Sequence, residues 1–127
     1  MQMKDFSAHG FLRVAAVTPQ VSIGDPHSNA ENMLSQIKLL AEQQVAVAVL
    51  PELSLSGYSA EDLFFTDKLL ADCRLALATL AQQQTLPLCA VGLPWRLPDG
   101  RLLNCAALLG GGKLLGRGLQ VGRAGLC

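Results

Sequence analysis

The stretch that decides the fold runs from residue 45 to residue 57 and reads Val-Ala-Val-Ala-Val-Leu-Pro-Glu-Leu-Ser-Leu-Ser-Gly. Its first six residues are apolar, rich in β-branched side chains and without polar alternation, which predicts a strand buried on both faces. Pro51 cannot donate a hydrogen bond to a neighbouring strand, so we expect the strand to end there. Glu52 then lies at the carboxyl end of a buried strand, where open α/β sheets form their ligand-binding crevices.

Glu52 is therefore the candidate general base of the chain. A carboxylate just past an apolar strand is costly to bury unless it is paired, hydrogen-bonded or protonated. A carboxylate held in that way is suited to proton transfer. The alternative is a strand-end acid that turns out to water, because perturbed carboxylates are a minority of such acids. Taken by itself, the Pro-Glu dipeptide leaves both interpretations open.

The residues before this strand predict a strand followed by a helix. Residues 13–17 read as a short strand, and Asp25 followed by Pro26 is typical of a helix start. We expect this helix to end near Gln44. Its core-facing stripe follows i, i+3, i+4 and i+7 spacing and consists of Ala30, Met33, Leu34, Ile37, Leu40 and Ala41, with Asn29 off the stripe.

The residues after the strand continue the alternation. Ser59 with Asp62 predicts a short helical turn, and Thr66 a cap for a second long helix. The core-facing residues of that helix are Leu69, Leu70, Cys73, Leu77 and Leu80. A strand at 86–91 and a glycine hairpin at 102–115 complete the order β-α-β-α-β-β-β. This order predicts an α/β layered fold with helices against one face of a sheet.

Composition excludes several classes of function. Half of the 127 residues are hydrophobic and 16% are charged, which argues for one small globular domain. Ten basic and ten acidic residues cancel, so no charge pattern points to nucleic acid or an anionic membrane. The apolar runs are far shorter than the roughly 20 residues of a membrane span. With no signal-peptide pattern at the N-terminus, we expect a cytoplasmic protein.

The cysteines and glycines predict no metal or nucleotide site in this segment. Cys73, Cys89, Cys105 and Cys127 form no C-x-x-C pair and have no histidine at zinc-ligand spacing, so we expect small buried side chains. Gly111-Gly112-Lys113 is not a phosphate-binding loop, because Ala107 stands where a glycine is needed and Leu114 where Ser or Thr is needed.

The segment from Pro51 to Tyr58, Pro-Glu-Leu-Ser-Leu-Ser-Gly-Tyr, resembles the first catalytic segment of the nitrilase (carbon–nitrogen hydrolase) superfamily. The extension Tyr-Ser-Ala-Glu-Asp-Leu at 58–63 is similar to the amidase domain of glutamine-dependent NAD synthetases of the long bacterial form. Residues 9–16, Ile23-Gly24-Asp25-Pro26 and Asn29 agree with it, and the resemblance runs from Phe6 to Gly116. It implies the N-terminal half of an α-β-β-α sandwich.

The resemblance also implies a chemistry. In that superfamily a Cys thiolate attacks an amide carbon, a Glu acts as general base and then acid, and a Lys stabilises the tetrahedral intermediate. Glu52 matches the Glu, and Tyr58 matches a position on the wall of the glutamine pocket. An aromatic side chain packed at the strand end is the alternative for Tyr58. The ammonia released from glutamine would travel to a synthetase domain, which uses ATP to amidate nicotinic acid adenine dinucleotide, and the intact protein would be a homo-oligomer.

The chain departs from this pattern after the hairpin. The lysine position falls at or beside Gln120, Lys113 belongs to the hairpin, and Cys127 lacks the expected Cys-Glu-Asp context. We therefore expect an N-terminal arm at 1–12, a partial nitrilase-like domain at 13–116 and a divergent tail at 117–127. Two hypotheses follow.

The first hypothesis is an inactive N-terminal piece of a glutamine-hydrolysing NAD synthetase. Its cause would be a fragmentary gene, a reading-frame shift between Gly116 and Gln120, or an incomplete sequence. The second is a small non-catalytic nitrilase-like protein that binds a partner or ligand. The Gly/Arg-rich tail favours the first, because a reading-frame shift removes apolar periodicity at once.

Overall fold

The computed structural model of this chain describes residues 10–57 and 66–119. Along the chain lie β1 (Val14–Ala16), α1 (Pro26–Glu42), β2 (Val47–Val49), α2 (Asp67–Gln83), β3 (Leu88–Arg96), β4 (Leu102–Gly110) and β5 (Lys113–Leu119). This order confirms the predicted alternation of strands and helices. The capping turn predicted at Ser59 and Asp62 lies outside the described residues.

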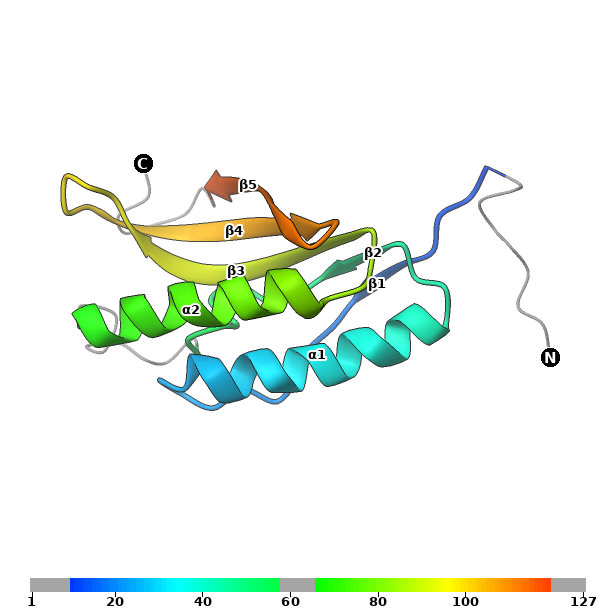
Figure 1. The fold of residues 1–127 in the computed structure, drawn as a ribbon, viewed down its shortest axis with the longest axis horizontal. Helices are drawn as coiled ribbons and strands as arrows, with labels where there is room; N and C mark the ends of the chain where they lie inside the picture. The colour runs from blue at the N-terminus through cyan, green and yellow to red at the C-terminus, as the bar shows by residue number, and fades with distance from the viewer. Residues whose placement is uncertain (1–9, 58–65, 120–127) are drawn as a thin grey trace.

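The strands form one mixed sheet in the order β1-β2-β3-β4-β5. β1, β2 and β3 are parallel, with Val47 of β2 opposite Val14 of β1 and Leu88 of β3. β3, β4 and β5 are antiparallel, joined by the hairpins at residues 97–101 and 111–112. Figure 1 shows α1 and α2 side by side on one side of this sheet. The described residues thus form one helical layer on one sheet.

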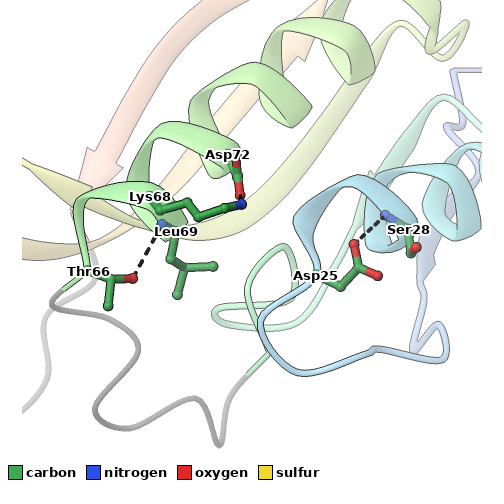
Figure 2. Close-up of polar contacts among 6 residues, drawn as sticks. All are labelled: Asp25, Ser28, Thr66, Lys68, Leu69 and Asp72. Carbon is green, nitrogen blue, oxygen red and sulfur yellow. Dashed lines mark hydrogen bonds and ion pairs between the residues drawn. The ribbon is translucent and has the colours of Figure 1, made fainter.

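Both helices begin at the caps that the sequence predicts. The Asp25 carboxylate accepts from the Ser28 N–H at 3.2 Å, and Pro26 is the first residue of α1. The Thr66 hydroxyl accepts from the Leu69 N–H at 3.3 Å at the start of α2 (Figure 2). Each cap satisfies an N–H group that has no partner inside the helix. Neither helix is long and apolar enough to cross a membrane in the part of the chain that the structure describes.

The core lies between the helices and the sheet face that they cover. Its least exposed large side chains, at most 1% accessible, include Met33 and Ile37 from α1, Leu80 from α2, and Val91, Leu93 and Leu109 from the sheet. Cys73, Cys89 and Cys105 are buried in the same cluster, as predicted. The helical periodicity of the sequence therefore identified the faces of α1 and α2 that pack on the sheet.

The prediction that the strand at 45–50 is buried on both faces is wrong. Ala48 is fully buried beneath the helices, whereas Val49 is 50% exposed and Val14, on the neighbouring strand, is 67% exposed. The reason is that both helices pack on one face, and the second face carries no layer formed by the described residues. The apolar run at 45–50 therefore places Val49 on a sheet face that no described layer covers.

Three further details differ from the expectations. β3 continues from Val91 to Arg96 because it pairs with β4 throughout, and Pro94 is tolerated since β2 ends opposite Ala90. β5 extends past Gly116 to Leu119, so the strand continues for three residues into the segment expected to lose periodicity. Asn29, placed off the core-facing stripe, is fully buried.

Candidate active site

Glu52 lies in a tight turn that follows β2 after Leu50 and Pro51. The Leu50 N–H donates to Ala90 O at 2.9 Å and the Leu55 N–H donates to Gly92 O at 3.0 Å, so the turn is hydrogen-bonded to β3 at both of its ends. The Glu52 side chain is exposed, while the residues from Leu53 to Gly57 are buried. The turn therefore presents its one carboxylate outward from a fixed, buried backbone.

Gly92 of β3 provides the seat for this turn. A Cβ atom at Gly92 would lie 2.5 Å from Leu53 N and 2.6 Å from Pro51 O, closer than real contacts allow. The close approach is needed because the turn folds back on itself, and Leu53 adopts a left-handed φ of +52° that is uncommon for residues other than glycine. Such strained positions persist only where the surroundings hold them, and they cluster at functional sites.

Asn29 of α1 holds the turn from the other side. Its Nδ2 donates to Leu55 O at 2.9 Å and to Ser22 O at 2.8 Å, and its Oδ1 accepts from the Ser22 N–H at 2.7 Å. The Gly24 N–H donates to Ser56 O at 2.8 Å beside it. The buried amide thus ties the segment before α1 to the Glu52 turn. One signal for this role was available beforehand, since Asn29 falls one residue before the apolar stripe.

Asn104 of β4 contacts the carboxylate itself. Its side-chain Nδ2 donates a hydrogen bond to Glu52 Oε1, and its place in the sheet is fixed by pairing opposite Pro94. Asn104 is the polar side chain in a strand that otherwise reads Leu-Leu-Cys-Ala-Ala-Leu-Leu-Gly. Its Oδ1 atom is buried and has no hydrogen-bond partner among the described residues. Sequence reasoning missed Asn104, although one amide in an apolar strand was the available signal.

Neither Cys73, Cys89 nor Lys113 supplies Glu52 with a nucleophile or a charge-stabilising lysine. Burial raises the pKa of the Cys73 thiol to about 12 and that of the Cys89 thiol to about 11, so both stay protonated and unreactive near neutral pH. Lys113 pairs opposite Gly110, six residues along β4 from Asn104, or roughly 20 Å away at the rise of a strand. Lys113 thus belongs to the hairpin, as expected from the sequence.

The remaining candidates lie outside the described residues or away from Glu52. Tyr58, Gln120 and Cys127 are not described, so the role predicted for Tyr58 stays a prediction. Within residues 10–57 and 66–119, no three His, Cys, Asp or Glu side chains are grouped so as to hold a metal ion. An open groove of about 620 Å³ lies at the other end of the parallel strands, between Phe11, Gln44 and Leu88. Sheets of this kind bind ligands at the carboxyl ends of their strands, which argues against the groove as the site.

Comparison with known proteins shows the family to which this chain belongs. The family model of carbon–nitrogen hydrolases matches residues 13–123, and the chain belongs to that family. Among curated proteins, it is 42% identical over 110 residues to the glutamine-dependent NAD(+) synthetase of Mycobacterium tuberculosis and 40% identical over 111 residues to that of Mycobacterium leprae. The matches cover 85% and 86% of this chain and 16% of each relative, so the chain spans about one sixth of their length.

Solved structures give the same result. A glutamine-dependent NAD(+) synthetase from Cytophaga hutchinsonii superposes with a TM-score of 0.83 at 28% identity, over 89% of this chain and 19% of that one. The enzyme from Acinetobacter baumannii in complex with ADP gives 0.74 at 30% identity, over 83% of this chain and 20% of that one. An amidase of the nitrilase superfamily from Nesterenkonia, 21% identical, shares the fold over 90% of this chain and 45% of its own, with a TM-score of 0.73. The chain thus has the fold of the N-terminal half of a nitrilase-type α-β-β-α sandwich.

Proposed function

We propose that this chain is the N-terminal part of the glutamine amidase domain of a glutamine-hydrolysing NAD synthetase, in which Glu52 is the general base. The observation that carries the proposal is the place of Glu52 at the carboxyl end of β2, on a turn whose backbone is fixed by β3 and α1. The similarity to glutamine-dependent NAD(+) synthetases supports glutamine as the substrate of the complete protein.

The proposed chemistry assigns Glu52 two successive proton transfers. As base it would take the proton of a cysteine thiol, and as acid it would return a proton to the departing ammonia. The thiol and the charge-stabilising lysine would come from residues beyond the described part.

Tyr58 is proposed as part of the glutamine pocket, an aromatic packed at the strand end being the alternative. The proposed partner is a synthetase domain that uses ATP, in a cytoplasmic homo-oligomer, and the proposed domain limits remain 1–12, 13–116 and 117–127.

We expect the purified 127-residue chain to hydrolyse no glutamine. A base without its nucleophile cannot form the acyl intermediate, and the members of such a set act as a unit. The measurement is ammonia release from glutamine, with and without the change Glu52→Gln. Ammonia release by the chain that disappears on Glu52→Gln would overturn this expectation.

The role of Glu52 is tested in a joined enzyme. Residues 13–116 of this chain replace the matching residues of the Mycobacterium tuberculosis relative, which supplies the rest of the protein. We expect glutamine hydrolysis that falls by about 100- to 10,000-fold on Glu52→Gln, the usual contribution of a general base. Glu31→Gln, an exposed acid on α1, is the matched control and should leave the rate unchanged. An active joined enzyme that tolerates Glu52→Gln would remove Glu52 from the mechanism.

A non-catalytic binding protein is the second candidate. The observation that favours it is the uncovered apolar sheet face with Val14 and Val49 at 67% and 50% exposure. An exposed apolar patch of this kind is an association surface. A joined enzyme that folds but has no glutaminase activity would favour this candidate.

A further inference from the structure

We propose that Asn104 is a positioning residue for Glu52. Its side-chain amide holds Oε1 of the carboxylate and leaves Oε2 to exchange the proton with the reacting group. The inference rests on the proposed function of Glu52 and adds to it a second residue from a different strand. It follows from the hydrogen bond between Asn104 Nδ2 and Glu52 Oε1 and from the surroundings of both side chains.

The fixed turn alone does not orient the carboxylate. The hydrogen bonds to Ala90, Gly92 and Asn29 all hold backbone atoms of the segment from residue 50 to residue 57. The Glu52 side chain itself is exposed, and three torsions separate its carboxylate from that backbone. A group that transfers a proton must stay within hydrogen-bond reach of its partner. Asn104 supplies the missing constraint by holding one carboxylate oxygen.

Asn104 is well placed to do this because its strand is rigidly packed. Its neighbours Leu103 and Cys105 are 4% and 1% exposed and point into the core under the helices. Side chains alternate along a strand, so Asn104 points to the opposite face. Glu52 is therefore held from the face of the sheet that the helices leave uncovered.

The orientation of the amide also follows from the chemistry of the pair. An ionised carboxylate only accepts hydrogen bonds, so the NH₂ group of Asn104 must face it. This arrangement leaves Asn104 Oδ1 buried without a partner among the described residues, an unfavourable state that most buried polar atoms avoid. Leucine has nearly the same shape as asparagine and would pack in this apolar strand without that cost. The contact with Glu52 accounts for the NH₂ group of this amide in an otherwise apolar strand.

The contact is first tested in the full 127-residue chain by nuclear magnetic resonance. We expect the side-chain amide signals of Asn104 to shift when Glu52→Met removes the acceptor, because a hydrogen bond to a carboxylate changes the environment of the donor protons. Asn32, an exposed amide on α1 that donates to Gln20 O, is the matched control and should not respond. An Asn104 signal that ignores Glu52→Met would overturn the proposal.

The positioning role is then tested in the joined enzyme with two matched pairs. Asn104→Leu removes the donor at constant size and should lower kcat by about 10- to 100-fold, the effect of one hydrogen bond to a charged group, with KM changed less than about twofold. The second pair uses side chains that are longer than asparagine: Asn104→Gln should retain more activity than Asn104→Met, because only Gln keeps the amide donor. Equal kcat values within both pairs would show that Asn104 serves packing alone.

These outcomes separate the inference from the proposed function. A joined enzyme that loses activity on Glu52→Gln but not on Asn104→Leu retains the function and refutes the positioning role. A joined enzyme unaffected by Glu52→Gln refutes the proposed function, and the resonance experiment still decides whether Asn104 holds the carboxylate.

Discussion

Along β1 and β2 both faces of the sheet are apolar, but their surroundings are very different. On the face that α1 and α2 cover, Ala48, Cys89 and Leu109 are fully buried. On the other face, Val14 is 67% and Val49 50% exposed, although both are as apolar as Ala48. The difference shows that strand composition predicts which residues can be buried, whereas the packing of other elements decides which of them are.

The largest expected effect is a loss of packing on the covered face. Leu80 is fully buried on α2, so Leu80→Ala should lower the free energy of unfolding by about 2–5 kcal/mol, through lost transfer energy and a cavity. Urea unfolding followed by circular dichroism measures the change. Leu75→Ala, on the same helix but at a residue 69% exposed, is the matched control and should stay within about 0.5 kcal/mol. Equal losses for both variants would contradict the assignment of the covered face.

A smaller effect is expected from the caps that begin the covering helices. Thr66→Ala removes the hydroxyl that accepts from the Leu69 N–H, and should cost about 1 kcal/mol (Figure 2). Thr79→Ala, in the interior of α2, changes the same side chain where no cap exists and should be neutral or slightly stabilising. The same unfolding experiment compares the two. A loss at Thr79 as large as that at Thr66 would show that the cap contributes nothing.

The smallest effect on stability is expected on the uncovered face. Val49→Thr keeps the size and the strand preference of the side chain, and should change the free energy of unfolding by less than about 0.5 kcal/mol. We expect the 127-residue chain to self-associate through this apolar face, and the added hydroxyl to weaken that association. Sedimentation velocity at several concentrations measures it. A monomeric parent chain would contradict the expectation, as would a stability loss at Val49 comparable with that at Leu80.

Local sequence patterns predicted the helices and the centres of the strands, because caps and apolar spacing act within a few residues. The Asp25 and Thr66 caps and the stripe with Met33 and Ile37 are of this kind. The position of Glu52 after a strand was likewise readable from Pro51. Family resemblance supplied the chemistry, which no spacing in the chain encodes.

What escaped prediction depends on contacts between distant segments. Gly92 lacks a side chain because a turn forty residues earlier rests on it, and Asn104 matters because that same turn brings Glu52 to it. Asn29 was placed off the core-facing stripe of its helix, although its Nδ2 donates to Leu55 O in the Glu52 turn. β3 extends to Arg96 because it pairs with β4. Pro94, considered within β3 alone, predicts an earlier end of the strand.

The strand order β1-β2-β3-β4-β5 also has a consequence for the way the chain folds. Each strand pairs with the one made just before it, so no strand has to insert between two that are already paired. A nascent chain leaves the ribosome with its N-terminal segments first. The sheet can therefore grow from the β1 edge in the order of synthesis, with the Glu52 turn completed when β3 supplies Gly92, and the contact to Asn104 added when β4 emerges.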